Sequence, residues 1–205
     1  MSMEVKICGL TNRDDALSAL DLGADYLGFV LYPESPRAIS ARLLAGLLDK
    51  LGRKCRAVGV FVNEDRKLVE TIASDCGLYA VQIHGDEPAD DFAGFPVPVW
   101  RAVRYVSGSW QPLPGKWKAE RYVVDSAVPG MYGGTGIAGD WKEAASFVKE
   151  HRAMLSGGLT PDNISEAIRI VRPLGVDTAS GVEAMPGRKD IRKLEDFLRK
   201  ARAGQ

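Results

Sequence analysis

The stretch Val5-Lys6-Ile7-Cys8-Gly9-Leu10-Thr11 is an apolar run that leads directly into one cysteine. Gly9 interrupts the run, and Thr11 or Asn12 can cap a helix that begins immediately afterwards. Cys8 is therefore predicted to end a buried strand, at the point where the chain leaves the core. A thiol there is rigidly held and open to a ligand. The alternative is that Cys8 only fills space as a small apolar residue.

Seven more apolar runs follow, and helical patterns separate most of them. The predicted strands cover residues 5–8, 26–31, 57–62, 80–84, 97–103, 122–125, 154–156 and 175–179. Helices are expected over about 12–22, 40–51, 140–150 and 190–201, with others capped by Asn63 and opened by Thr160-Pro161. In the second helix, the side chains expected to face inward are Leu43, Leu44, Leu47 and Leu48. Because the strands are apolar throughout, both faces of the sheet should be buried, as in a parallel sheet.

This pattern predicts an α/β protein, a (β/α)8 TIM barrel that forms a single domain over residues 1–205. About 250 residues are typical of this fold, so the barrel would be short. Residues 107–115 contain two prolines and two glycines, so the fifth helix is expected to be reduced or replaced by a loop. An open doubly wound sheet is the alternative. It expects several glycines after the first strand, where this chain supplies only Gly9.

Composition narrows the class of partner. Lys and Arg number 27, as do Asp and Glu, so the formal net charge is zero. That balance argues against nucleic acid or an anionic membrane as a partner, because both require a basic surface. No apolar run approaches the roughly 18 residues of a membrane span, and residues 1–4 do not resemble a secretory signal. The three cysteines, Cys8, Cys55 and Cys76, form no CxxC pair, so we expect neither a disulfide framework nor a metal site. The same cysteine usage fits a reducing environment, so we expect a cytoplasmic location.

Cys8 and Asp125 are the candidate catalytic residues. They end the first and sixth predicted strands, and the active site of a TIM barrel lies at the C-terminal ends of its strands. A thiolate can take a proton from carbon, and a protonated carboxyl can give one to oxygen. The ordinary pKa values are about 8.5 and 3.9, so the site would have to lower the first and raise the second. Lys6, two residues before Cys8 on the same strand, can face the same way.

Small residues after the last two strands suggest a phosphate site. Gly157-Gly158 and Ser180-Gly181 carry no bulky side chains, so backbone N–H groups can approach an anion there. The loops after strands seven and eight are the usual phosphate position in this architecture. The alternative is that both pairs merely form tight turns.

Two more polar residues follow strands. Arg37 lies after Ser35-Pro36 on a loop stiffened by proline, and its guanidinium could bind a substrate carboxylate. His84 ends the fourth predicted strand and could donate a hydrogen bond to a substrate. A surface role for Arg37 and a purely internal role for His84 are the competing interpretations.

Several sequence blocks resemble the phosphoribosylanthranilate isomerase family of tryptophan biosynthesis. They run in the expected order from residue 5 to residue 190, and together they are specific. The blocks are Lys6-Ile7-Cys8-Gly9-Leu10-Thr11, Gly28-Phe29-Val30 with Ser35-Pro36-Arg37, Val58-Gly59-Val60-Phe61-Val62-Asn63, Val81-Gln82-Ile83-His84-Gly85-Asp86-Glu87, Gly133-Gly134-Thr135-Gly136 with Asp140-Trp141, Ser156-Gly157-Gly158-Leu159-Thr160-Pro161, Gly175-Val176-Asp177, Ser180-Gly181-Val182-Glu183 and Pro186-Gly187-Arg188-Lys189-Asp190.

The resemblance implies a TIM barrel that performs an Amadori rearrangement without a cofactor. Its substrate would be N-(5′-phosphoribosyl)anthranilate, a small phosphosugar, and its product 1-(2-carboxyphenylamino)-1-deoxyribulose 5-phosphate. By this resemblance Cys8 is the general base, Asp125 is the general acid and Arg37 binds the anthranilate carboxylate. The remaining substrate-binding residues would be His84, Gly134, Gly157, Gly158, Ser180 and Gly181. The protein would be a monomer or a homodimer.

The chain departs from the family pattern at two places. Residues 137–139, Ile-Ala-Gly, replace the lysine and phenylalanine that are common there, and Ala179 replaces a common serine. The nearest alternative function is the related aminoaldose isomerase of histidine biosynthesis, which resembles this fold but uses aspartate where Cys8 stands. A non-catalytic phosphosugar-binding barrel and a redox sensor based on Cys8 are alternatives from other classes.

Overall fold

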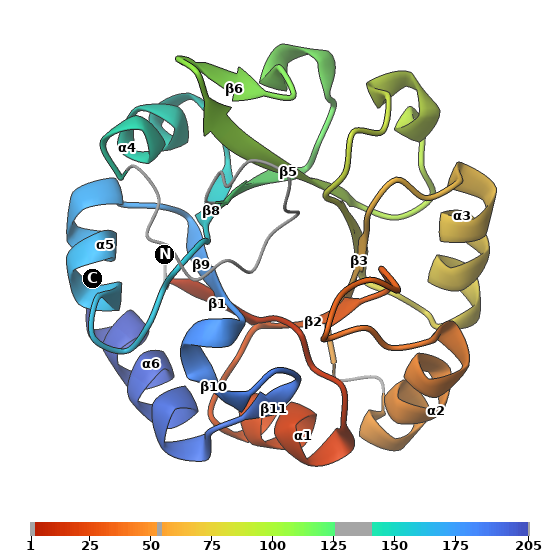
Figure 1. Ribbon diagram of the computed structural model, residues 1–205, viewed down its shortest axis with the longest axis horizontal. Coiled ribbons are helices and arrows are strands. Elements are labelled where there is room, and N and C mark those ends of the chain that lie inside the picture. Colours follow the sequence, from red (N-terminus) through yellow and green to blue (C-terminus); the bar gives the residue numbers. More distant parts are fainter. Residues whose placement is uncertain (1–2, 53–54, 126–140, 205) are drawn as a thin grey trace.

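Eight parallel strands form a closed barrel in the part of the chain that the structure describes (Figure 1). This computed structural model describes residues 3–52, 55–125 and 141–204. The barrel strands are β1 (Glu4–Ile7), β2 (Tyr26–Val30), β3 (Ala57–Phe61), β4 (Ala80–Ile83), β5 (Val99–Val106), β7 (Arg121–Asp125), β8 (Ala153–Leu155) and β9 (Gly175–Thr178). Each strand pairs in parallel with the next, and the pairing of β9 with β1 closes the ring. The predicted TIM barrel is confirmed.

Helices surround the barrel on its outside (Figure 1). They are α1 (Arg13–Asp21), α2 (Ala41–Leu51), α3 (Arg66–Asp75), α4 (Trp141–Glu150), α5 (Ile164–Val171) and α6 (Ile191–Ala203). In α2, Leu44 and Leu47 are buried against the sheet, whereas Leu43 is 67 % exposed. The expectation that Leu43 faces inward is wrong, because a step of one residue turns a helix by about 100° and carries Leu43 past the edge of the buried face.

The connections on either side of β5 contain no α-helix. After β4 the chain makes only a single 3-10 turn, η1 (Ala89–Phe92). After β5 it turns back as β6 (Ser109–Gln111), which pairs antiparallel with β5, and then forms η2 (Pro114–Lys116). The predicted loss of the fifth helix is therefore confirmed. Strand β6 and the replacement of the fourth helix by a 3-10 turn were not predicted. The two reduced connections explain how so short a chain closes a barrel.

Strand alternation decides which side chains enter the barrel. Along β1, Val5 and Ile7 pack between the sheet and the helices, so Lys6 and the following Cys8 face inward. Near the N-terminal ends of the barrel strands, which we call the lower end, the interior contains an apolar cluster of Tyr26, Val58, Ala80, Trp100, Val123 and Met154. The C-terminal ends, where the cavity lies, are the upper end. The residues two positions further along several of these strands are polar, and they form the floor of the site.

Two helix starts differ from the predictions. Asp65, not Asn63, caps α3 through hydrogen bonds from the backbone of Lys67 and Leu68. The Asn63 side chain instead accepts a hydrogen bond from the backbone N–H of Asp86, 2.7 Å away, and so ties together the loops after β3 and β4. Helix α5 begins at Ile164, later than predicted from Thr160-Pro161, because residues 161–163 form a turn.

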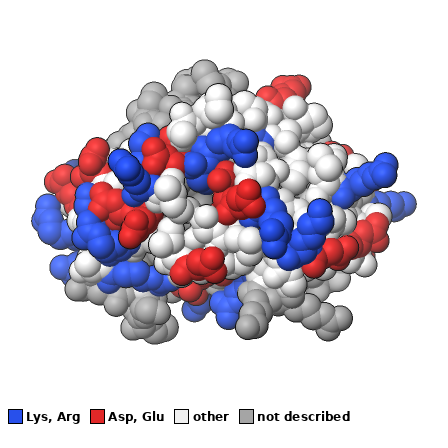
Figure 2. Space-filling model, turned by 90° about the horizontal axis from the view of Figure 1, so that it is seen from below, with Lys and Arg blue, Asp and Glu red and all other residues white. Residues whose placement is uncertain are grey.

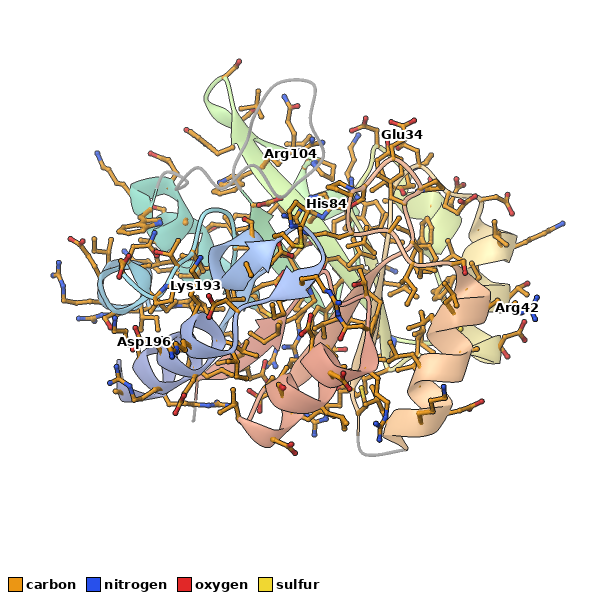
Figure 3. The ribbon with its side chains drawn as sticks, turned by 60° about the horizontal axis from the view of Figure 1, so that its bottom comes forward. Glu34, Arg42, His84, Arg104, Lys193 and Asp196 are labelled. Atoms are coloured by element: carbon orange, nitrogen blue, oxygen red, sulfur yellow. The ribbon has the colours of Figure 1, made fainter. Side chains whose placement is uncertain are left out.

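The outer surface carries charges of both signs. On the side that Figure 2 shows, basic and acidic side chains are interspersed rather than segregated. Figure 3 places Arg42 of α2 and Asp196 of α6 at the outer rim, while His84 lies near the middle of the molecule. Within the described residues, no helix combines the length and the apolar composition that crossing a membrane requires.

Candidate active site

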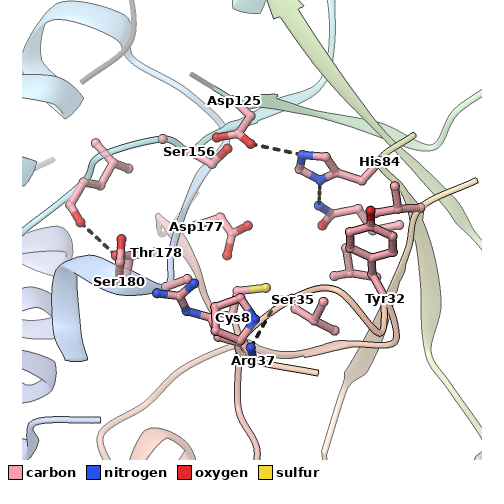
Figure 4. Close-up of a pocket in the computed structure, with 18 of the residues that line it drawn as sticks. Cys8, Tyr32, Ser35, Arg37, His84, Asp125, Ser156, Asp177, Thr178 and Ser180 are labelled. Carbon is pink, nitrogen blue, oxygen red and sulfur yellow. Dashed lines mark hydrogen bonds and ion pairs between the residues drawn. The ribbon is translucent and has the colours of Figure 1, made fainter. Parts of the chain in front are cut away.

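A cavity of about 320 Å³ opens at the C-terminal ends of the barrel strands (Figure 4). Its volume is in the range of small-molecule sites. Most of the predicted site residues that the structure describes line it: Cys8, Arg37, His84, Asp125, Gly157, Gly158 and Ser180. Gly181 follows Ser180 in the short turn η3 (Ser180–Val182), and Gly134 lies outside the described residues. Barrel closure thus brings together residues that are more than 170 positions apart.

Cys8 lies on the cavity wall directly after β1 and is only 8 % exposed. Burial raises the pKa of its thiol, and the nearby Lys6 opposes that increase. Lys6 is completely buried, and its ammonium lies 2.7 Å from Asp177 Oδ2. Burial alone would lower the pKa of Lys6, but Asp177 and Cys8 raise it above its ordinary value. Burial also raises the pKa of Asp177, against the opposing effect of Lys6, but the close contact of the two side chains favours the charged pair beside the thiol.

Asp125 ends β7 on another part of the cavity wall and pairs with His84. The His84 Nε2 lies 3.0 Å from Asp125 Oδ2, and the Gln82 side-chain nitrogen lies 3.1 Å from His84 Nδ1. Because the Gln82 amide donates to Nδ1, the imidazole proton sits on Nε2 and is donated to Asp125. The three side chains form one hydrogen-bond chain across β4 and β7 (Figure 4).

Arg37 reaches the cavity from the loop after β2 and is held by Glu183. Its Nε and Nη2 donate to the two carboxylate oxygens at 2.9 and 2.7 Å. Burial would raise the pKa of Glu183, but the hydrogen bond from Arg37 and the nearby Lys189 outweigh it and lower that pKa. The aliphatic part of the Arg37 side chain passes over Gly9, where a Cβ would lie 2.6 Å from Arg37 Cδ. Gly9 has φ of +72°, so the glycine after Cys8 allows both the turn and the arginine above it.

The loops after β8 and β9 meet at one end of the cavity. A Cβ on Gly181 would lie 1.9 Å from the backbone oxygen of Leu159, so only glycine permits this approach of the two loops. The Thr178 hydroxyl donates to the same oxygen at 2.8 Å, and the Asn163 amide donates to the Gly158 oxygen at 2.9 Å. These contacts hold two segments of small residues side by side, as an anion site made from backbone groups requires.

Several residues in and around the cavity were not predicted. Gln82 and Asp177 line it. Glu183 accepts hydrogen bonds from Arg37, and Lys189 donates one to the backbone oxygen of Cys8 and pairs with Glu183. A usable signal was present for Asp177, because a charged residue within a buried apolar strand requires a partner. The sequence offers no means of identifying that partner as Lys6. Among the described residues, no group of three or more His, Cys, Asp or Glu side chains could hold a metal ion.

The fold and the position of the cavity define an enzyme of the (β/α)8-barrel class, with its site at the C-terminal ends of the strands. Residues 5–200 match the sequence model of the N-(5′phosphoribosyl)anthranilate (PRA) isomerase family. The chain therefore belongs to the phosphoribosylanthranilate isomerase family, an enzyme family of tryptophan biosynthesis, which confirms the resemblance.

Individual relatives match over nearly the whole chain. The N-(5′-phosphoribosyl)anthranilate isomerase of Trichlorobacter lovleyi is 43 % identical over 201 residues, which cover 98 % of each chain. A crystal structure of the phosphoribosyl anthranilate isomerase from Thermotoga maritima has a TM-score of 0.86 and 36 % identity, and covers 98 % of this chain and 99 % of that one. A further isomerase structure, in complex with reduced 1-(o-carboxyphenylamino)-1-deoxyribulose 5-phosphate, has a TM-score of 0.83 and 34 % identity, with the same coverage.

Proposed function

We propose that the chain converts N-(5′-phosphoribosyl)anthranilate to 1-(2-carboxyphenylamino)-1-deoxyribulose 5-phosphate, with Asp125 as general acid and Cys8 as general base. The observation that carries this proposal is that one cavity is lined by Cys8, Asp125, Arg37 and the glycine pair after β8. A thiol, a carboxyl, a guanidinium and an anion site match the reacting carbon, ring oxygen, carboxylate and phosphate of that substrate.

Asp125 starts the reaction by opening the ribose ring. Its carboxyl gives a proton to the ring oxygen, the bond from C1 to that oxygen breaks, and the anthranilate nitrogen forms a protonated Schiff base with C1. His84 donates to Oδ2, so Oδ2 acts as the carbonyl oxygen and the transferable proton is carried on Oδ1. The Gln82–His84–Asp125 chain thus orients the acid. His84 acts on the substrate through Asp125 in addition to lining its site.

Cys8 completes the isomerisation. Its thiolate removes the proton from C2 of the Schiff base, and the electron pair moves into the C1–C2 bond and neutralises the nitrogen. The resulting enol gains a proton at C1 and loses one from the C2 oxygen, which yields the ketone. Atoms and electrons balance without an oxidant or a cofactor.

The geometry of the cavity rim supports the proposed binding roles. Arg37, held by Glu183, is placed to pair with the anthranilate carboxylate, and rigid attachment lowers the cost of ordering its side chain on binding. Gly157, Gly158, Ser180 and Gly181 are proposed to bind the phosphate through backbone N–H groups, and Gly134 to complete the substrate site. Residues 1–205 are proposed to act as one domain, as a monomer or a homodimer in the cytoplasm.

The proposal is tested by following the loss of fluorescence of freshly made phosphoribosylanthranilate. The purified chain is expected to turn over the substrate, and Cys76→Ser, a cysteine outside the cavity, is expected to behave as the parent. Assaying the aminoaldose substrate of the histidine pathway in parallel separates the two isomerase activities. Absence of any turnover at micromolar enzyme would overturn the proposed function.

A further inference from the structure

Lys6 is fully buried directly beside Cys8. The two residues are two positions apart at the end of β1 and face the same side of the sheet. A Cβ on Gly28 of β2 would lie 2.7 Å from Cys8 Sγ and 3.0 Å from Lys6 Cε. The Cys8 thiol and the end of the Lys6 side chain therefore share the space above Gly28. That space is available because residue 28 is a glycine and has no side chain.

Asp177 holds the ammonium of Lys6 from the neighbouring strand. The two residues are paired in the register of β1 and β9, and Lys6 Nζ lies 2.7 Å from Asp177 Oδ2. Both side chains are buried, with 0 % and 7 % of their surface exposed. The second carboxylate oxygen, Oδ1, is buried and accepts no hydrogen bond from any residue that the structure describes, although Asp177 lines the cavity. Asp177 Oδ2 thus anchors the Lys6 ammonium in the neighbourhood of the Cys8 thiol.

We propose that Lys6 is a positioning residue whose ammonium stabilises the Cys8 thiolate, while Asp177 anchors that ammonium and opposes the thiolate. The proposal rests on the assignment of Cys8 as the base under the proposed function. Lys6 transfers no proton in it. The C2 proton of the substrate passes to Cys8 Sγ, and the charge of Lys6 offsets the negative charge that the thiolate carries before that step.

The electrostatics of the surroundings agree with this division of roles. Burial raises the pKa of Cys8, Lys6 acts against it, Asp177 adds to it and Lys189 also acts against it. Lys189 differs from Lys6 because its ammonium donates to Glu183 and to the backbone oxygens of Cys8 and Ala179. Among the described residues, the other charged or titratable groups that line the cavity are Tyr32, Glu34, Arg37, His84 and Asp125.

The test is the pH dependence of Cys8 alkylation by iodoacetamide in the protein without substrate, read by mass spectrometry of the Cys8 peptide. Lys6→Met is expected to shift the profile upward by at least one pH unit, which is about tenfold slower alkylation at a fixed pH below the transition. Asp177→Asn is expected to shift it downward, because the thiolate then becomes the counter-ion of Lys6. A loosened structure would move both variants in the same direction, so opposite shifts are specific to charge.

Two comparisons guard against misfolding and non-specific effects. Lys6→Met leaves Asp177 buried without its counter-ion, which can prevent folding. The double variant Lys6→Met/Asp177→Asn removes both charges, and its profile is expected to lie above that of Asp177→Asn alone. Cys55 and Cys76 report the general reactivity of each variant, and their profiles are expected to stay unchanged.

Lys189→Met is the matched lysine variant and is expected to shift the Cys8 profile less than Lys6→Met does. An equal shift would attribute the effect to the general positive charge of the barrel mouth and overturn the role of Lys6. The role of Lys6 would also be overturned if Lys6→Met left the Cys8 alkylation profile unchanged, or if Asp177→Asn failed to shift that profile downward.

Steady-state kinetics of the isomerase reaction provide an independent measurement. Lys6→Met is expected to lower kcat at pH 7 at least tenfold with little change in KM, and to move the rising limb of the pH–rate profile upward with the alkylation profile. If the parent chain has no isomerase activity, the proposed function fails while the alkylation shifts still test the Lys6–Cys8 coupling. If activity is present and the shifts are absent, only the role of Lys6 fails.

Discussion

The two ends of the barrel interior each contain a buried cation paired with a carboxylate, but their surroundings differ. At the lower end, Arg121 pairs with Glu4, and its guanidinium carbon lies 5.1 Å from the Tyr26 ring centre and 4.4 Å from that of Trp100. At the upper end, Lys6 pairs with Asp177 beside a thiol and a cavity.

The difference shows that a buried pair of a cation and a carboxylate can serve either packing or chemistry. Two aromatic rings and the carboxylates of Glu4 and Glu120 surround the Arg121 guanidinium, and only its Nε lacks a hydrogen-bond partner among the described residues. Its charge therefore supports packing and does not face the cavity. Lys6 has a carboxylate on one side and a reactive side chain on the other, so part of its charge remains available to Cys8. We expect the lower pair to determine stability and the upper pair, with Asp125, to determine chemistry.

The largest effect is expected from the acid and the base themselves. Asp125→Asn and Cys8→Ser should each reduce kcat by about 10² to 10⁴-fold with little change in KM, because both groups act in proton transfer. Steady-state kinetics measure the change, and thermal unfolding serves as the control. Near-normal turnover in Cys8→Ser would remove its assignment as the base.

The next largest effect is expected from the lower pair, on stability alone. Arg121→Ala should reduce the free energy of unfolding by about 3 kcal/mol, because it removes the cation that pairs with Glu4 and empties the space beside the Tyr26 and Trp100 rings. Urea unfolding measures the loss, and kcat per folded molecule should stay at the parent value. A large fall in kcat with normal stability would contradict the separation of the two ends.

A smaller effect is expected at the glycine beneath Arg37. Gly9→Ala combines a positive φ with a contact against the Arg37 side chain, so it should cost about 1–3 kcal/mol of stability and raise KM by displacing the guanidinium. Gly23→Ala is the matched control, because Gly23 also has a positive φ but a Cβ there would contact nothing within 4 Å. Equal effects of both variants on KM would show that Arg37 does not depend on Gly9.

The smallest effect is expected on the pH dependence of stability. The pKa of Glu183 is lower in the folded chain than its ordinary value, so the folded state binds fewer protons there than the unfolded state. The corresponding stabilisation is present above the unfolded pKa, near 4.5, and is lost as the pH falls through the folded pKa. Glu183→Gln should flatten the fall in unfolding free energy below pH 5, measured by denaturant titration at several pH values. An unchanged slope would exclude Glu183 as a contributor.

Much of the site could be predicted because barrel geometry gathers strand ends. Once eight strands are recognised, Cys8 and Asp125 must lie at the same mouth as Gly158 and Ser180. The partners of these residues could not be predicted in the same way. For His84 the sequence left open a contact with the substrate and a purely internal role. Its hydrogen bond with Asp125, 3.0 Å away, depends on the spacing of β4 and β7 in the closed ring, which the sequence does not give.

The sequence by itself determined the order of the eight barrel strands, the missing fifth helix, the position of Cys8 at a strand end and the family. These features depend on local alternation, on proline and glycine, and on motifs, all of which are properties of neighbouring residues. Only the tertiary structure decided that Lys6 meets Asp177, 171 positions away, and that Arg37 meets Glu183, 146 positions away. The Lys6–Asp177 pair arises from the register in which β1 closes on β9, and the Arg37–Glu183 pair joins the segments that follow β2 and β9. A buried charge specifies that it needs a partner without specifying which one.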